Sequence, residues 1–362
     1  MTDYIIMDET GNDGFEPWLS PQKFYIHGAA ILRNTSFLEV MQLTTDLRRQ
    51  VDLRSIHMSE LNISKRKEIA EAVAYVLRNV KWEWLCAGVE KEFFVSDYIS
   101  RIAFASIRHV PTGDAMKEID TYGDLINLLT DIMVPRHLKA QIWNALLNGN
   151  ENKLYHAFTE LFVISDGSPS KILSSLAALI DAFASEKDIF ALILKGRAFR
   201  MSSNRYDKYR FRQLVEHLER KCNFSTAVYR QEDNEALKKY FFNRDRTGKT
   251  KADTDGIGIT QNLDFKFVRK PECEIADAML WVTKVWHEER LRNFHTKNPT
   301  KETVPLIKPF EGNASGIMVS RMDASEALFK SKRETLNEKL FQDLVKEYVS
   351  RQADYRWPDT RP

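Results

Sequence analysis

The chain has 362 residues, of which 43% are hydrophobic and 11% aromatic, so it can bury a substantial core and is not globally disordered. Its 53 Lys and Arg residues nearly balance 51 Asp and Glu residues, which excludes a polybasic protein that binds nucleic acid by overall charge alone. Three cysteines without zinc-like spacing, no visible signal peptide and no long apolar run predict a cytoplasmic protein without a membrane anchor.

The first half of the chain is predicted to alternate strands and helices. The segment 23–32 is a β segment in which Gly28 is a candidate turn between two hairpin strands. Apolar residues at helical spacing predict two early helices, and a mostly helical pattern follows the third β segment. The expected elements are a strand at 3–8, the β segment at 23–32, helices at 36–51 and 64–79, a connector at 55–62, a strand beginning at 81, and helices over about 95–185.

The second half is predicted to return to strands before it ends in helices. Its expected elements are strands at 189–195, 224–230 and 263–269, helices at about 204–221, 231–242, 272–291 and 324–350, a loop at 244–262 and an irregular stretch at 296–322. The mixture of strands and helices predicts an α/β fold.

Four carboxylates occupy positions that merit attention. Asp8 ends the first strand, where a charge is costly unless it is paired or binds a metal. Asp277 lies within a largely apolar helix, Glu60 follows His57 by three residues, and Glu90 ends the third β segment. Each also has an ordinary interpretation: a turn cap for Asp8, favourable charge near a helix N-terminus for Glu60, and solvated surface acids for the other two.

The chain order of these acids resembles that of the ribonuclease H-like fold, in which carboxylates hold two divalent ions for phosphodiester cleavage. Hard oxygen ligands suit Mg²⁺ or Mn²⁺. The pattern therefore predicts a metal site made of Asp8, Glu60, Glu90 and Asp277. His57 is the candidate to position water or to protonate a leaving group.

Four short stretches, "YIIMDETGN", "FYIHGAAIL", "IHMSEL" and "CEIADAMLW", resemble the domain-of-unknown-function family 3800, whose members resemble ribonuclease H-like nucleases. Asp8 and Glu9 match the acids of its Asp-Glu-Ser/Thr-Gly-Asn opening. The family's middle segment is matched at His57 and Glu60, and its late Gln-x-Ala-Asp helix at Asp277. Further acids that fall on or near the pattern, and are possible additional ligands, are Glu9, Glu232, Asp233 and Glu274, the last replacing the expected Gln.

The resemblance implies an α/β domain at residues 1–295, with a mixed sheet flanked by helices and a helical insertion at about 95–205. A C-terminal loop and helix extension would occupy 296–362. It also implies a metal-dependent nuclease that acts by a two-metal mechanism, in a setting of phage defence or mobile elements. The alternative is a catalytically inactive module on the same fold that binds nucleic acid or a partner protein.

A basic and aromatic stretch at 194–214 is the candidate contact for RNA or DNA, since basic groups bind phosphates and aromatic rings stack on bases. Its ordinary interpretation is an amphipathic helix with aromatics toward the core. The helical insertion and the C-terminal helix are candidate surfaces for a homodimer or another partner. The basic residues in question are Arg197, Arg200, Arg205, Lys208, Arg210 and Arg212.

Overall fold

The structure is a computed structural model in which two compact units are distinguished. The first unit comprises Met1–Val89 and Asn204–Met318, and the second comprises Glu90–Ser203 and Val319–Pro362. The predicted extension at 296–362 is thus divided between both units. The structure describes residues 3–11, 22–97, 99, 127–128, 130–131, 134–165, 205–223, 225–230, 263–268, 271, 273–292, 304–310, 312–321 and 323–324.

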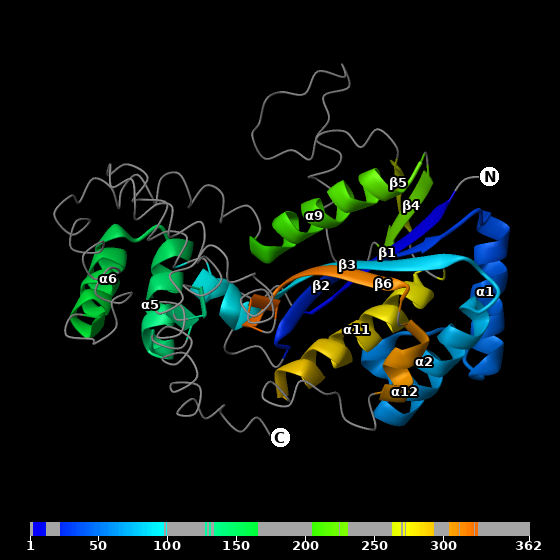
Figure 1. Cartoon of the computed structure of the whole chain (residues 1–362), viewed down its shortest axis with the longest axis horizontal. Coiled ribbons are helices and arrows are strands. Elements are labelled where there is room, and N and C mark those ends of the chain that lie inside the picture. Colours follow the sequence, from blue (N-terminus) through cyan, green and yellow to red (C-terminus); the bar gives the residue numbers. More distant parts are fainter. Residues whose placement is uncertain are drawn as a thin grey trace, which may run out of the picture. The chain divides into compact units, whose positions relative to one another are not determined.

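A mixed sheet forms the centre of the first unit, which confirms the α/β class (Figure 1). In the described residues its strand order is β5-β4-β1-β2-β3-β6. β1 runs antiparallel to β2 and parallel to β4, and β4 runs parallel to β5. The strands are β1 Tyr4–Thr10, β2 Phe24–Leu32, β3 Trp82–Glu90, β4 Ser225–Arg230, β5 Leu263–Val268 and β6 Ala314–Val319.

Helices cover both faces of this sheet (Figure 1). The described helical elements of the first unit are α1 Phe37–Gln50, η1 Met58–Glu60, α2 Ile63–Leu77, α9 Arg205–Lys221, α11 Glu274–Arg292, α12 Val304–Ile307 and η2 Lys308–Phe310. Those of the second unit include α5 Arg136–Leu147 and α6 Glu151–Ser165. No helix of the described residues has the length and apolar character needed to cross a bilayer.

Local sequence signals explain where the early helices begin. The Ser36 side chain accepts a hydrogen bond from the Glu39 backbone, and the Glu39 carboxylate accepts one from the Ser36 backbone at 2.6 Å. This capping box satisfies two backbone donors that the first turn of α1 would otherwise leave unpaired. Asn62 caps α2 in a similar way, by accepting a hydrogen bond from the Lys65 backbone at 2.9 Å.

Alternating side chains along β1 divide between the two sheet faces. Ile5 and Met7 join a buried apolar cluster with Leu214 and Leu218 of α9, so this face is covered by α9. Asp8 has the opposite parity and pairs with Gly28 of β2, which lies against Leu280 of α11. Because cross-strand partners project to the same side of a sheet, Asp8 lies on the face that α11 covers.

Gly28 does not form the hairpin turn considered from the sequence, because β2 is a single nine-residue strand. Glycine is needed at this position for a different reason, which is close packing. A Cβ at this position would lie 2.2 Å from Cη2 of Trp84 and 2.9 Å from Cδ2 of Leu280. The indole of Trp84 therefore occupies the space above the glycine, and its Nε1 donates a hydrogen bond to Oγ1 of Thr283 at 2.9 Å.

The stretch predicted to be irregular, 296–322, instead contributes α12, η2 and the strand β6. Trp84 donates a backbone hydrogen bond to Asn313 at 2.7 Å just before β6 begins. Gly316 packs closely on Cys86 of β3. Most of β6 is exposed or half-buried, which explains why a search for buried apolar strands overlooks it.

The predicted strand at 189–195, helix at 231–242, loop at 244–262 and most of the helix at 324–350 lie outside the described residues.

Candidate functional site

Asp8 is nearly inaccessible to solvent, with 3% of its surface exposed. It lies near the end of β1, and one carboxylate oxygen, Oδ1, accepts a hydrogen bond from the Glu9 backbone at 2.8 Å. Asp8 lies within β1 and bonds the next residue, not the residue two positions on as in an Asx turn, so the turn-cap interpretation is wrong.

Asp277 lies in the first turn of α11 and faces η1. Its Oδ2 accepts a hydrogen bond from the Met58 backbone at 2.9 Å and lies 3.3 Å from Nδ1 of His57. The other imidazole nitrogen of His57 lies 3.1 Å from Oγ of Ser59. The ring is thus oriented from both sides, and Asp277 connects α11 to the segment that carries His57 and Glu60.

The positions of Asp8 and Asp277 along their elements place both acids in the layer between the sheet and α11. Leu280 follows Asp277 by about one helical turn and lies over Gly28, the direct cross-strand partner of Asp8. The first turns of α11 therefore cover the part of the sheet that carries Asp8. Both acids are buried, with Asp277 at 9% exposure.

Glu60 lies close to this group but is directed toward solvent. Its side chain is 75% exposed, and Oε1 is 3.8 Å from Nε2 of His57. The structure therefore brings His57, Glu60 and Asp277 together, with Glu60 at the exposed end.

Glu9 and Glu274 each have a specific partner that the sequence did not reveal. Glu9 projects to the opposite sheet face from Asp8 and accepts a hydrogen bond from the Tyr25 hydroxyl at 2.9 Å. Glu274 is buried and binds the Arg48 guanidinium through two bonds of 2.9 and 2.7 Å. The bond to Glu274 raises the pKa of Arg48, so this acid anchors α11 to α1.

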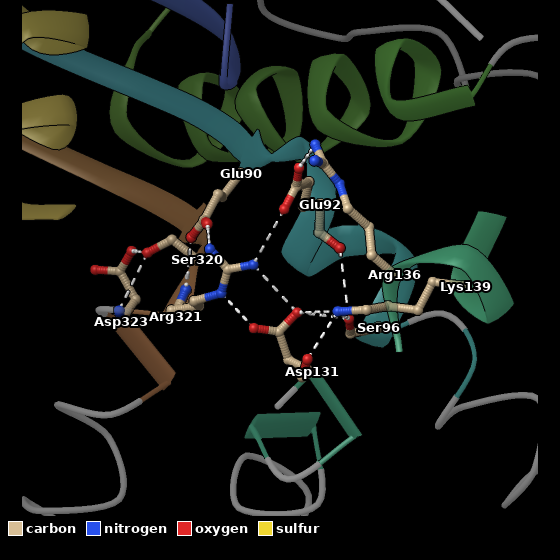
Figure 2. Close-up of polar contacts among 9 residues, drawn as sticks. All are labelled: Glu90, Glu92, Ser96, Asp131, Arg136, Lys139, Ser320, Arg321 and Asp323. Carbon is tan, nitrogen blue, oxygen red and sulfur yellow. Dashed lines mark hydrogen bonds and ion pairs between the residues drawn. The ribbon is translucent and has the colours of Figure 1, made fainter. Parts of the chain in front are cut away.

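Glu90 belongs to the second unit, where it contacts Arg321 (Figure 2). Both the Arg321 backbone, at 3.0 Å, and its guanidinium donate hydrogen bonds to this carboxylate. Burial raises the pKa of Glu90 to about 7, although the charge of Arg321 opposes that shift.

The same guanidinium binds Asp131, which also receives a hydrogen bond from Lys139 at 2.9 Å (Figure 2). Burial acts to raise the pKa of Asp131, but the charges of Arg321 and Lys139 outweigh it and hold that pKa below its usual range. We refer to Glu90, Asp131, Lys139 and Arg321 as the Arg321 cluster. The last three were not singled out from the sequence, although an isolated acid within the apolar stretch "LLTDIMV" is a signal that could have indicated Asp131.

The predicted nucleic-acid contact is described only in part. The backbone of 205–221 forms α9, as expected, and its later residues pack on the sheet. Four other candidates lie outside the described residues, namely Arg197, Arg200, Glu232 and Asp233. For four more, the backbone is described but the side chain is not, namely Arg205, Lys208, Arg210 and Arg212.

The carboxylates of Asp8 and Asp277 are the hard oxygen donors that Mg²⁺ and Mn²⁺ prefer. Within the part of the chain that the structure describes, no group of three or more His, Cys, Asp or Glu residues has an arrangement able to hold a metal ion. The pair fits the donor chemistry, and a complete set of ligands would need further residues.

Comparison of the chain with protein-family models, with curated proteins and with solved structures finds no match.

Proposed function

We propose that the chain is a metal-dependent nuclease that hydrolyses phosphodiester bonds on a ribonuclease H-like fold. The observation that carries the proposal is the placement of two buried acids, Asp8 and Asp277, in the layer between the sheet and α11. Both carboxylates accept backbone hydrogen bonds, which offset part of the cost of burial, and a bound cation would offset the charge itself. A central acid-bearing strand in a mixed sheet is compatible with that fold.

Asp8 and Asp277 are the residues that would hold divalent ions, which supply Lewis-acid chemistry for phosphodiester hydrolysis when bound. The neighbouring carboxylate Glu274 has a different task, because Arg48 already neutralises it. Glu60 remains a predicted ligand at the exposed end of the group, next to His57.

We infer that His57 transfers a proton in this reaction. Asp277 contacts its Nδ1 and Ser59 contacts its Nε2, so the imidazole is fixed in orientation before a substrate arrives. Imidazole is the side chain most often used for proton transfer near neutral pH. Because His57 is 28% exposed, a substrate can reach it without rearrangement of the core.

The direct test is cleavage of labelled RNA and DNA, single- and double-stranded, with Mg²⁺, Mn²⁺ or EDTA. We expect metal-dependent cleavage that falls by at least about 100-fold in Asp8→Asn and in Asp277→Asn, more than is usual when a group that merely orients a metal ligand is lost. Glu71→Gln, at an exposed acid of α2, is the matched control and should retain full activity. Full activity in both site variants would refute the proposal.

The same experiment distinguishes the non-catalytic alternative. Binding of RNA or DNA in EDTA as well as in Mg²⁺, with no cleavage under any condition, would favour a nucleic-acid-binding module on this fold.

A further inference from the structure

The Arg321 cluster is balanced in charge and almost completely buried. Its two acids, Glu90 and Asp131, and its two bases, Lys139 and Arg321, have side chains between 1% and 6% exposed. Arg321 binds both acids, Lys139 binds Asp131, and at the edge of the cluster Arg321 also lies 3.6 Å from Oε2 of Glu92, which is 27% exposed (Figure 2). A buried charge without a partner is strongly unfavourable, so the removal of any one member leaves an excess charge in the interior.

Ser96 and Lys139 extend the contacts of Asp131. The Ser96 hydroxyl donates to Oδ1 of Asp131 at 2.7 Å, and Lys139 also donates to the Asp131 backbone carbonyl at 2.7 Å. The cluster thereby connects the helical residues 91–97, the residues around Asp131 and the first turns of α5.

Arg321 reaches this place from far along the chain. It is separated from Glu90 by 231 residues and from Asp131 by 190 residues, and Ser320 lies between it and Val319, the last residue of β6. Ser320 and Asp323 hydrogen-bond to each other, and the Asp323 backbone donates to Oγ of Ser320 at 3.1 Å. These bonds connect Ser320, which precedes Arg321, to Asp323, which follows it.

We propose that the stability of the second unit depends on its residues Ser320, Arg321 and Asp323, because Arg321 supplies the charge that balances Glu90 and Asp131. Without Arg321, Asp131 keeps the ammonium group of Lys139 but Glu90 loses its guanidinium, so the fold must either bury an unbalanced carboxylate or protonate Glu90, whose pKa burial already raises. Residues 91–97 and α5 then keep the direct bonds of Lys139 to Ser96 and Asp131 but lose the link that Arg321 makes between Glu90 and Asp131. In this arrangement Glu90 binds Arg321. Glu90 is therefore assigned a structural role in place of the predicted metal-ligand role.

Charge rescue in the full-length chain tests this inference. Arg321→Met removes the balancing charge, and Glu90→Gln in the same chain restores neutrality by leaving Lys139 with Asp131. The matched control is Arg136→Met, which removes a half-exposed arginine that binds Glu92 at 2.6 Å at the edge of the cluster. Amide hydrogen exchange at 91–97 and 136–143 is the measurement.

We expect exchange in these segments to be at least tenfold faster in Arg321→Met, unchanged in Arg136→Met, and substantially restored in the double variant. Equal exchange in the two single variants would overturn the inference, as would a double variant no better protected than Arg321→Met. If Arg321→Met does not fold, the double variant decides the question: a folded double variant supports charge balance, and an unfolded one contradicts it. The measurement needs no nuclease activity, so it is independent of the proposed function.

Discussion

His287 gives the chain a predictable sensitivity to mild acid. The residue lies in α11 on the sheet-facing side, buried beside the ring of Phe24 at a centroid distance of 5.7 Å. Burial, with a smaller contribution from Arg290, lowers the pKa of His287 to about 3. The folded first unit therefore keeps this imidazole neutral well below the pH at which an unfolded chain protonates it.

The direction of the pH effect on stability follows from the number of protons that the folded and unfolded states bind. Between a pKa of about 6.5 in the unfolded chain and about 3 in the fold, the unfolded state binds more protons, so the free energy of unfolding falls as the pH falls. At pH 5, which is about one and a half units below the unfolded value, the loss from this residue amounts to about 2 kcal/mol. The loss would reach about 4 kcal/mol at pH 3 and level off near about 5 kcal/mol below that pH.

Urea unfolding at pH 7 and pH 5 measures the effect. His287→Phe keeps an aromatic ring but cannot be protonated. Between pH 7 and pH 5, its free energy of unfolding should therefore fall by about 2 kcal/mol less than that of the parent chain. His156→Phe, at an exposed position of α6, is the control and should change the pH dependence little. An identical pH dependence in the parent chain and in His287→Phe would show that His287 is not held neutral by burial.

Three further substitutions test the packing and anchoring contacts of the first unit. Gly28→Ala would place a Cβ 2.2 Å from the Trp84 ring and should cost about 1–3 kcal/mol in urea unfolding; addition of Trp84→Phe, which removes the clashing atoms, should recover part of that loss, and an unaltered Gly28→Ala stability would refute the close contact. Glu274→Gln should lower the free energy of unfolding by about 1–3 kcal/mol and retain nuclease activity. The loss is smaller than the loss expected from breaking a fully buried ion pair, because Arg48 is 28% exposed. A loss of cleavage as large as in Asp277→Asn would instead make Glu274 a ligand. Ser36→Ala should lower the thermal midpoint through a loss of about 1 kcal/mol, and an unchanged midpoint would argue against the capping box.

Much of the first unit follows from local patterns. Helical spacing of apolar residues places α1, α2, α9 and α11 within about two residues of their observed ends, and runs of apolar residues locate β1, β4 and β5. The two errors have physical causes. Gly28 indicated a turn because glycine often marks one, whereas here it makes room for Trp84, and β6 escaped notice because it is a largely exposed strand at the sheet edge.

The site was predictable to a smaller extent. Asp8 and Asp277 were conspicuous because each is a charge within an apolar segment, and the structure buries both. The partners of the other acids were not predictable, since Arg48 lies 226 residues from Glu274 and Arg321 lies 231 residues from Glu90. Pairs so distant in the chain are set by tertiary packing, which spacing and periodicity do not encode.

The most direct test of the account is a calorimetric titration of the full-length protein with Mn²⁺. We predict binding to the parent chain and to Glu71→Gln, and affinity at least about tenfold weaker in both Asp8→Asn and Asp277→Asn, with circular dichroism spectra unchanged. Failure of the parent chain to bind Mn²⁺, or equal affinity in the parent and both site variants, would contradict the claim that these two acids belong to one metal site.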